Sequence, residues 1–303
     1  MAKFVPDINT KRWVVISPGR VTRPEDIIVK PQGFVDPKKS SCPFCGGNEG
    51  MTPPEVWRIG GEGQWNGPDW KVRVVPNKYE ITDVHEVIIH SPNHQTDIEN
   101  LPLNQVKTIL WVYRQRYQAH EKDGQVLIFC NHGVHAGASL KHPHSQLVVL
   151  PRQINLDTLS REPLKNLVEE NKFFTVYCPD FSQWPYEVWL APRSLGEEGI
   201  AQNSGSFRPT SFGEITDLEL ADLAEILQRT LKRLLIISQG QIVAKLNPDQ
   251  DFSYNYYIYH GQNWYLRIIP RFIHRAGFEL GTGLNVNVVD PVTAAEELKR
   301  TNL

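Results

Sequence analysis

The sequence of 303 residues predicts an α+β fold built from one unit that occurs twice. Short apolar runs alternate with long helical segments along the chain. The stretch "HEVIIHSP" at 85–92 resembles "YEVWLAPR" at 186–193, and each is followed by a long helix and an apolar strand. Later in each copy, "LVVLPR" resembles "LRIIPR". We therefore expect a first unit at 1–155 and a second at 156–303; chance similarity between β-rich segments is the alternative.

Local patterns predict the individual elements. Helical periodicity covers about 102–121 and about 214–237, and the second of these has acids early and bases late, as the helix dipole favours. Residues 156–172 and 291–300 are predicted to form further helices, and the Gly/Ser-rich stretch 193–213 a loop. Runs rich in Val and Ile, bounded by Pro, Gly or Asn, predict strands at 12–17, 71–75, 85–90, 125–131 and 145–150.

Composition and charge argue against several classes of function. The formal net charge is −2 and the basic residues are scattered, so no nucleic-acid partner is expected. No apolar run approaches the ~20 residues that a membrane span needs, so no membrane partner is expected either. The segment "MAKFVPDINTKRW" lacks the apolar core of a signal peptide, and we expect a cytoplasmic protein.

The segment His-Pro-His-Ser-Gln at 142–146 carries the strongest chemical signal. Alternate residues of an extended segment share a face, so His142, His144 and Gln146 are expected to point the same way. Imidazole ligates metals, and as a neutral base near pH 7 it attacks phosphorus. Gln146 can hydrogen-bond a phosphoryl oxygen, and the preceding "HAGAS" loop offers backbone N–H groups and the Ser139 hydroxyl to a phosphate. Either histidine alone is readily explained as a hydrogen-bonded residue at the rim of a sheet, without a chemical role. The combination favours phosphate chemistry.

The repeat provides an internal test of this motif. Aligning the two copies on the proline of "LPR" and "IPR" places Asn263 opposite His144 and Tyr265 opposite Gln146. The second copy therefore lacks the histidine. If the motif carries chemistry, only the first unit performs it.

The chain has four cysteines, and two of them form a Cys-x-x-Cys knuckle, "SCPFCGG". Cys42 and Cys45 are typical of half of a tetrahedral zinc site. A redox dithiol is the alternative, although no βαβ context precedes it. Cys130 and Cys178 lie in apolar runs and are interpreted as inert buried thiols. Spacing leaves the remaining zinc ligands open among His85, His90, His94, His132, His135 and His142.

Two arginines are candidates for binding an anion. Arg20 and Arg23 lie on an apparent loop, where two guanidinium groups can hold a diphosphate by paired hydrogen bonds. Solvated surface arginines are the alternative. Asn77 in "VVPNKYE" follows a strand and, taken alone, is a turn residue.

As a set, these motifs resemble the galactose-1-phosphate uridylyltransferase family, a branch of the histidine-triad superfamily. The matching pieces span most of the chain and include "RWVVISPGRVTRP", "CPFC", "VVPNKY", "EVIIHSPNH", the "GAS..HPHSQ" block and "AGFELGTG". The resemblance implies two histidine-triad-like repeats that form an antiparallel half-barrel sheet flanked by helices. The first repeat would be catalytic and the second degenerate.

The resemblance also implies a role for each candidate. His144 would attack the α-phosphorus of a nucleotide-diphosphate sugar and release a sugar 1-phosphate, leaving a nucleotidyl-histidine that a second phosphorylated acceptor resolves. Gln146 and Ser139 would bind the phosphoryl oxygens that gain charge. The nucleotide and phosphate pocket would be lined by Arg20, Arg23, Asn77 and Asn131. One structural zinc ion would be held by Cys42, Cys45, His94 and His142.

The sequence departs from the family at two places, and each changes a role that the resemblance would imply. Many members have His-x-His in the second repeat as part of a second metal site, whereas this chain has Asn263-Trp264-Tyr265, so we predict no second metal. The classical sugar-binding segment is replaced by "FELGTGLNVNV" at 278–288, which looks more like the branch that contains plant ADP-glucose phosphorylase. By analogy, Glu279 would contact the sugar.

The resulting hypothesis is an enzyme, a ping-pong nucleotidyltransferase of the UDP-glucose:hexose-1-phosphate type with galactose 1-phosphate as an acceptor. The first alternative is adenylyl transfer of the ADP-glucose phosphorylase type, with inorganic phosphate as acceptor. Hydrolysis of nucleotide conjugates and non-catalytic nucleotide binding are the other classes. The partners would be a nucleotide-diphosphate sugar and a hexose 1-phosphate, and the family implies a homodimer.

Overall fold

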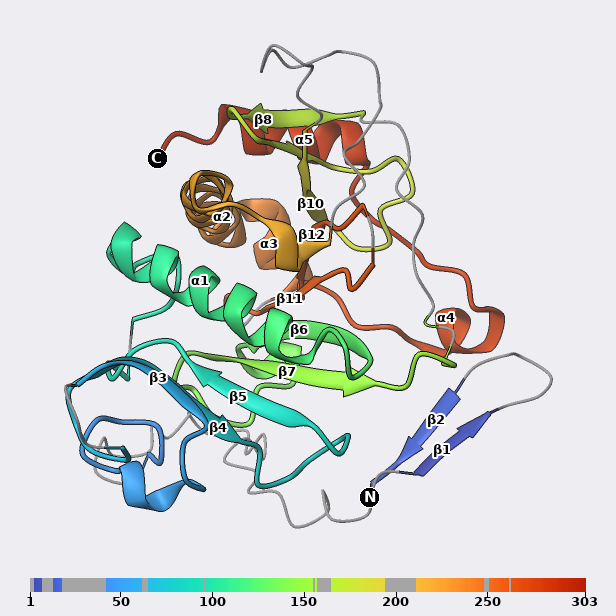
Figure 1. Cartoon of the computed structure of the whole chain (residues 1–303). Helices are drawn as coiled ribbons and strands as arrows, with labels where there is room; N and C mark the ends of the chain where they lie inside the picture. Colours follow the sequence, from blue (N-terminus) through green and yellow to red (C-terminus); the bar gives the residue numbers. More distant parts are fainter. Residues whose placement is uncertain are drawn as a thin grey trace.

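The computed structural model describes residues 3–6, 13–17, 42–61, 65–94, 96–154, 156, 165–193, 211–247, 251–261 and 263–303. Among these residues, one large antiparallel sheet of ten strands carries two long helices on one face, and a two-stranded hairpin forms separately (Figure 1). The sheet does not close into a barrel. The predicted α+β class with an antiparallel sheet is confirmed.

The strands of the large sheet come from both halves of the chain. They are β3 (Trp57–Gly60), β4 (Trp70–Pro76), β5 (His85–Ile89), β6 (Gln125–His132), β7 (His144–Leu150), β8 (Leu167–Glu170), β9 (Phe174–Tyr177), β10 (Val188–Pro192), β11 (Tyr254–Ile258) and β12 (Leu266–Pro270). Their spatial order is β3-β4-β5-β7-β6-β11-β12-β10-β9-β8, so the second half mirrors the first about the β6–β11 pair. The hairpin consists of β1 (Lys3–Pro6) and β2 (Trp13–Ile16).

Two long helices cover one face of the sheet, α1 (Leu103–His120) over the first half and α2 (Asp217–Ser238) over the second (Figure 1). Thr216 and Glu219 begin α2 with a reciprocal capping box, which satisfies two backbone donors that a helix start leaves open. The remaining helices are α3 (Gln241–Leu246), α4 (Gly277–Thr282) and α5 (Pro291–Arg300), with short 3-10 turns η3 (Glu49–Met51), η4 (Val134–Ala136) and η5 (Phe212–Glu214).

The predicted strands and both long helices are confirmed within a few residues, as is the short helix at 291–300. The helix predicted at 156–172 is wrong where the structure describes it, because Leu167–Glu170 is the strand β8 at the edge of the sheet. Pairing with β9 outweighs the local helical pattern there. The loop predicted at 193–213 falls largely outside the described residues.

The strand register gives the middle of the sheet two faces of different chemistry. Directly paired residues share a face, so Ile88, Ser145, Cys130 and Tyr256 lie together on the face beneath α1, which we call the core face. Val87, Gln146, Phe129 and Tyr257 lie on the opposite face, the outer face. Because His144 alternates with Ser145, the sequence motif at 142–146 presents its functional side chains on the outer face.

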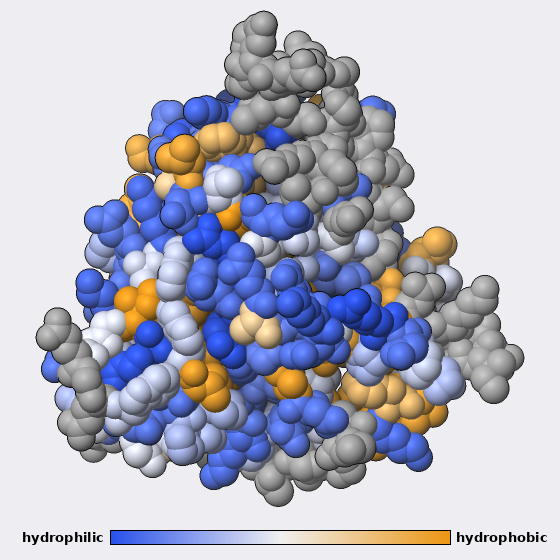
Figure 2. All heavy atoms as spheres, viewed as in Figure 1, coloured by the Kyte–Doolittle hydropathy of each residue, from blue (hydrophilic) through white to orange (hydrophobic). Residues whose placement is uncertain are grey.

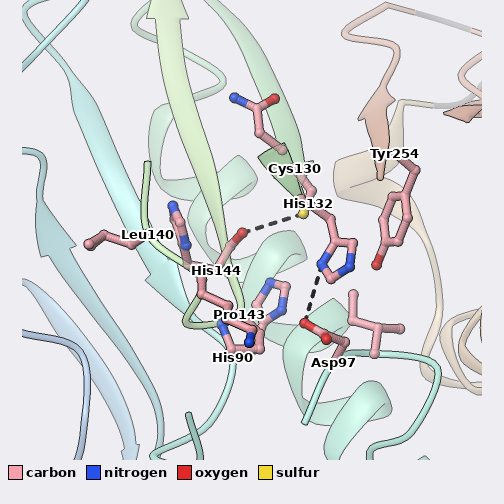
Figure 3. Close-up of a pocket in the computed structure, with 12 residues that line it drawn as sticks. His90, Asp97, Cys130, His132, Leu140, Pro143, His144 and Tyr254 are labelled. Carbon is pink, nitrogen blue, oxygen red and sulfur yellow. Dashed lines mark hydrogen bonds and ion pairs between the residues drawn. The ribbon is translucent and has the colours of Figure 1, made fainter. Parts of the chain in front are cut away.

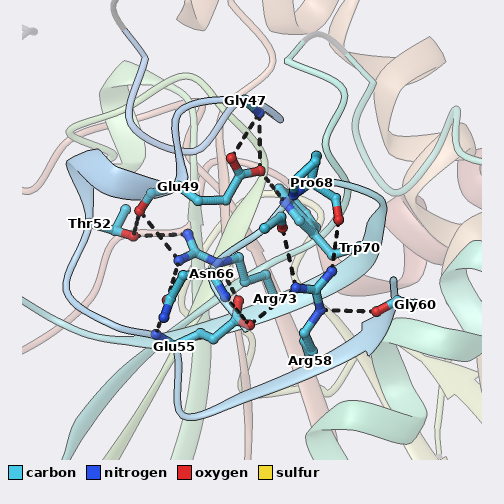
Figure 4. A network of polar contacts seen from close by, with 11 residues as sticks. Gly47, Glu49, Thr52, Glu55, Arg58, Gly60, Asn66, Pro68, Trp70 and Arg73 are labelled. Carbon is cyan, nitrogen blue, oxygen red and sulfur yellow. Dashed lines mark hydrogen bonds and ion pairs between the residues drawn. The ribbon is translucent and has the colours of Figure 1, made fainter. Parts of the chain in front are cut away.

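The segment 42–51, which we call the cysteine loop, packs on the outer face against Val87 and Ile89. A buried polar network holds it there (Figure 4). Glu49 accepts hydrogen bonds from Trp70 Nε1 at 2.8 Å and from the Gly47 N–H at 3.0 Å. The Arg73 guanidinium, 1% exposed, pairs with Glu55 at 2.6 Å and donates to Thr52 at 2.8 Å. The loop is therefore tied to β4 by bonds that are shielded from water.

The viewed surface is largely hydrophilic, with apolar side chains gathered over α4 and the β1–β2 hairpin at the right of the view (Figure 2). Phe278, Leu280 and Leu284 are more than half exposed in the α4 region. Among the described residues, none of the helices combines the length and the apolar content that crossing a membrane requires.

A charge cluster connects α1 to the sheet. Glu86 on β5 accepts hydrogen bonds from Arg116 at 2.6 and 2.9 Å and from His120 Nε2 at 3.1 Å, while His120 Nδ1 lies 3.1 Å from Asp123. The bond to Glu86 raises the pKa of His120, and burial only partly opposes this. For Glu86, burial alone would raise the pKa, but the bonds from His120 and Arg116 outweigh it and lower the pKa.

Replacing the histidine of this cluster, His120→Gln, is expected to destabilise the protein in a pH-dependent way. Because the folded-state pKa of His120 is raised, its contribution is fully present below the unfolded pKa of about 6.5 and is lost as pH rises through the folded pKa. We expect a loss of about 1 kcal/mol in the free energy of unfolding at pH 6 and almost none at pH 9. Urea denaturation at both pH values measures it.

His274→Gln is the matched control, because His274 is exposed and its pKa is lowered by burial, by His135 and by Arg271 rather than raised by a carboxylate. A loss for His120→Gln of the same size at both pH values would contradict the assignment.

Candidate active site and metal centre

The strand β7 positions the two central side chains of the site. His144 and Gln146 lie on the outer face, and their neighbour Ser145 lies on the core face. Both are almost buried, with 8% of His144 and 7% of Gln146 exposed. The ring of Phe44 from the cysteine loop packs edge-on against the His144 ring, with centroids 5.2 Å apart. The predicted alternation of His142, His144 and Gln146 is thus realised in the fold.

One hydrogen bond fixes the protonation of the His144 ring. Its Nδ1 lies 2.7 Å from the carbonyl oxygen of His142, which can only accept. Nδ1 therefore carries the hydrogen, and in the neutral ring Nε2 carries the lone pair. His144 also lines a small cavity of about 10 Å³, together with His132, Asp97 and Tyr254 (Figure 3). That space has room for at most one water molecule and is far too small for a nucleotide.

Gln146 contacts two other polar residues of the outer face. His85 Nε2 lies 2.9 Å and Asn77 Nδ2 lies 3.4 Å from its side-chain oxygen. Asn77 in turn accepts a hydrogen bond from the Tyr79 N–H at 2.8 Å. Asn77, which the sequence offered only as a turn residue with an implied binding role, therefore lies beside the central glutamine.

Four buried side chains form a cluster that can hold a metal ion. They are Cys42, Cys45, His94 and His142, and their ligand atoms all lie within 4.8 Å of one another. Cys45 Sγ is 3.4 Å from His94 Nδ1 and 3.7 Å from His142 Nδ1, and Cys42 Sγ is 3.6 Å from the latter. Of the six histidines that spacing left open, His94 and His142 are the two that the fold brings to the cysteines.

The surroundings of the cluster suit a cation. His142 Nε2 lies 2.8 Å from the Ser91 carbonyl, so it carries the hydrogen and Nδ1 directs its lone pair at the thiols. Burial lowers the pKa of His142 to about 4, which keeps the ring neutral. Burial, with a further contribution from Cys45, raises the pKa of Cys42 to about 12. Two adjacent buried thiols become thiolates only when a cation compensates their charge.

A network of hydroxyl groups supports β7 from the core face. His90 Nε2 lies 2.8 Å from Ser145 Oγ and 3.0 Å from Tyr113 OH, and Ser145 Oγ lies 3.0 Å from Tyr256 OH. Complete burial lowers the pKa of His90 well below its usual value, so the ring is neutral. The network joins β5, α1, β7 and β11, and it fixes the strand that carries His144 relative to both halves of the sheet.

The loop before β7 is held by the second half of the chain. Gly133 has a φ of +80°, and a Cβ atom there would lie 2.1 Å from Ser253 Oγ, so only glycine fits. Asn255 Nδ2 donates to Asn131 Oδ1 at 2.8 Å and to the Ala136 carbonyl at 2.9 Å. Asn131 is thereby placed at the end of β6, next to the loop that carries Ser139. The phosphate-binding role of Ser139 stays a prediction.

Three predicted residues are not brought to this site by the described structure. Arg20 and Arg23 lie outside the described residues. Glu279 lies on α4, where its carboxylate accepts a hydrogen bond from the Ala276 N–H at 2.9 Å, and its contact with a sugar stays a prediction.

A second group of potential ligands, Asp97, Glu99 and His132, lies beside the small cavity. His132 Nδ1 is 3.3 Å from Asp97, and the ring stacks on Tyr254 with centroids 4.5 Å apart (Figure 3). Burial opposes a charged ring here, but Asp97 and Glu99 outweigh it and raise the pKa of His132. The Asp97–His132 ion pair accounts for this arrangement without a metal, and the absence of a second metal stays a prediction.

Sequence reasoning missed a function for two outer-face residues. His85 was considered only as a metal ligand, and Asn255 was not considered. Neither has a local signal, because each acts through a partner on another strand: His85 reaches Gln146, and Asn255 reaches Asn131.

Known proteins resemble this chain over nearly its full length. Residues 82–151 match a family described as galactose-1-phosphate uridyl transferase, N-terminal domain. ADP-glucose phosphorylase of Arabidopsis thaliana is 27% identical over 98% of this chain and 92% of that protein. Galactose-1-phosphate uridylyltransferase of Thermotoga maritima is 24% identical over 97% of this chain and 96% of that protein. The chain is therefore similar to the galactose-1-phosphate uridylyltransferases and to ADP-glucose phosphorylase along nearly its whole length.

Solved structures agree with this relationship. The crystal structure of the A. thaliana ADP-glucose phosphorylase with bound ADP-glucose has a TM-score of 0.69 at 25% identity, and the match covers 100% of both chains. A uridylyltransferase structure has a TM-score of 0.69 at 24% identity, covers 99% of this chain and 98% of that one, and shows the fold alone. The resemblance recognised from "HPHSQ" and "CPFC" is confirmed, as is an enzyme of the nucleotidyltransferase type. The cytoplasmic location, the homodimer and the division at residue 155 stay predictions.

Replacing one cysteine of the cluster, Cys42→Ser, is expected to remove the bound metal and lower thermal stability together. A few kcal/mol of metal-binding energy correspond to a fall in Tm of roughly 5–10 °C in a chain of this size. Elemental analysis and calorimetry of the purified variant measure both effects. Cys178→Ser is the control, because Cys178 is buried in the second half of the molecule, away from the cluster, and its loss should leave the metal content unchanged. Full metal content in Cys42→Ser would rule out the cluster.

Proposed function

We propose that the chain transfers a nucleotidyl group from a nucleotide-diphosphate sugar to a phosphorylated acceptor through a covalent intermediate on His144. The observation that supports this most directly is the orientation of the ring. The hydrogen bond from Nδ1 to the His142 carbonyl leaves the lone pair on Nε2, on the face of the sheet that also carries Gln146. A neutral imidazole with a fixed tautomer is the nucleophile that an attack on phosphorus requires.

Each half-reaction exchanges one bond for another at phosphorus. His144 Nε2 forms a bond to the α-phosphorus while the bond from that phosphorus to the bridging oxygen breaks, and sugar 1-phosphate leaves with the electron pair. The ring then bears a positive charge, which the His142 carbonyl stabilises through the retained Nδ1–H. In the second step an acceptor phosphate oxygen attacks the same phosphorus, and the P–N bond breaks to restore the neutral ring.

Donors around the nucleophile would stabilise the phosphoryl oxygens as they gain charge. Gln146 lies on the same strand face as His144 and is proposed for this role, with Ser139 and the backbone of the 133–139 loop. Asn77 and Asn131, with Arg20 and Arg23 from outside the described residues, are proposed to bind the nucleotide phosphates. Because the small cavity has room for at most one water molecule, the nucleotide sugar would approach over the outer face of the sheet.

The cluster of Cys42, Cys45, His94 and His142 is proposed to hold a structural zinc ion. Tetrahedral zinc with two sulfur and two nitrogen ligands places sulfur and nitrogen about 3.5 Å apart, from bonds of about 2.3 and 2.0–2.1 Å. The observed sulfur–nitrogen separations of 3.4, 3.6 and 3.7 Å fit this geometry. The bound ion would stabilise the fold and fix His142, and the residues above would carry out the transfer.

The relatives favour two donors. ADP-glucose is proposed first, because the Arabidopsis ADP-glucose phosphorylase is the more identical of the two curated relatives compared, and inorganic phosphate would then be the acceptor. UDP-glucose with a hexose 1-phosphate acceptor, the leading prediction from the sequence, is second and is supported by the family match over 82–151 and by the Thermotoga relative.

Incubation with labelled ADP-glucose or UDP-glucose, without acceptor, tests the proposal. We expect an acid-labile nucleotidyl adduct on His144 with one of the two donors, and release of one glucose 1-phosphate per site. His144→Asn keeps a polar side chain of similar size without the nucleophilic nitrogen and should abolish the adduct, a loss of at least about 10⁴-fold in turnover. Peptide mass spectrometry identifies the modified residue.

The acceptor dependence separates transfer from hydrolysis. We expect the adduct to be discharged by inorganic phosphate or a hexose 1-phosphate and to persist in buffer alone. Rapid discharge by water would favour the hydrolase alternative, and an adduct that forms equally on His144→Asn would refute the assignment.

A further inference from the structure

The hydrogen position on His85 is fixed by its backbone neighbour. The N–H of Ile81 lies 3.0 Å from His85 Nδ1, and a backbone N–H can only donate. Nδ1 must therefore accept and be unprotonated. In the neutral ring the single hydrogen is then on Nε2, which points at Gln146.

The same reasoning fixes the orientation of the Gln146 amide. The Nε2–H of His85 needs an acceptor at 2.9 Å, so the oxygen rather than the nitrogen of Gln146 faces it. Asn77 is oriented by the Tyr79 N–H, which donates to its oxygen, so its Nδ2 is a second donor, 3.4 Å from the same Gln146 oxygen. Nδ2 also lies 3.1 Å from His85 Nε2, but two N–H donors cannot bond each other, so both donate to the Gln146 oxygen. Among the described residues, both hydrogen bonds of Gln146 end on that one atom.

The opposite orientation of the amide would be unfavourable. It would place the NH₂ group of Gln146 against two donors, His85 Nε2–H and Asn77 Nδ2–H, and the burial of His85 and Gln146 leaves little water to compensate. His85 is 4% exposed and Gln146 is 7% exposed. With its oxygen held on the side of β5, the side chain directs its two N–H donors away from β5, on the face that carries His144.

We propose that His85 is a positioning residue that aims the N–H donors of Gln146 at the phosphate transferred by His144. This rests on the proposed function. A donor that is already aimed needs no reorganisation when charge develops on the phosphoryl oxygen, so its benefit falls on the chemical step rather than on ground-state binding. Cleavage of the phosphate bond would thus depend on a residue that acts through Gln146.

The experiment uses the metal-loaded full chain and two substitutions at this position. His85→Ala removes the donor, and His85→Gln restores an N–H near the position of Nε2. We expect His85→Ala to slow single-turnover adduct formation by about 10- to 100-fold and to change the donor dissociation constant by less than about threefold. His85→Gln should recover most of the rate. Metal content and Tm, measured on all variants, exclude a loss of folding.

A double-mutant cycle shows whether the effect passes through Gln146. In a Gln146→Ala background, His85→Ala should slow the reaction by less than about twofold, because there is no amide left to orient. A full, independent loss in that background, or a His85→Ala rate equal to that of the unsubstituted protein, would overturn the proposal.

A measurement without turnover separates this inference from the proposed function. Two-bond ¹H–¹⁵N NMR of the histidine rings, with His85 assigned by its absence in His85→Gln, should show hydrogen on Nε2 and none on Nδ1. Hydrogen on Nδ1 would overturn the positioning role whether or not the enzyme is active. If the NMR result holds but no donor forms an adduct, the proposed function fails and the orientation of the amide stands.

Discussion

His142 joins the metal cluster to the proposed nucleophile, and the geometry of the site depends on this one residue. Its Nδ1 faces the thiols of Cys42 and Cys45, its Nε2–H is held by the Ser91 carbonyl, and its own carbonyl accepts the Nδ1–H of His144. The ring and the backbone of one residue thus fix the cysteine loop on the sheet and the tautomer of the neighbouring imidazole. A structural ion can influence the chemistry in this way without contacting the substrate.

In the second half of the sheet, the positions that correspond to the His-Pro-His-Ser-Gln motif carry other residues. Tyr265, opposite Gln146 in the aligned repeats, is buried on the outer face and stacks on Trp189 with centroids 4.0 Å apart. The faces also refine the alignment of the earlier strand. Ile88 and Val188 both face the core, so the two strands correspond at an even offset, whereas the direct match of "HEV" at 85–87 with "YEV" at 186–188 has an odd offset. A slip of one residue would exchange the two faces.

Local periodicity was enough to predict that His144 and Gln146 share a face, because alternation within one strand does not depend on the rest of the fold. The long helices were equally predictable from their own sequence. The partners of Gln146 were not, because His85 reaches it through the register of β5 on β7, and the two residues are 61 positions apart in the sequence. Leu167–Glu170 was misread as helix for the same reason: its pairing with β9 is a tertiary contact that the local pattern does not contain.

Two residues, His142 and His85, hold the functional side chains of the outer face, and they act on different parts of the proposed reaction. The cysteine loop holds His144 from one side, through His142, and determines where the proposed nucleophilic nitrogen lies. The turn before β5 holds Gln146 from the other side, through His85, and determines where the donors point. Burial of a ring that becomes positively charged would be costly alone, but a carbonyl on Nδ1 and a phosphate on Nε2 offset that cost. Hydrogen bonds therefore orient the site from both sides without a substrate, as stabilisation of a developing charge requires.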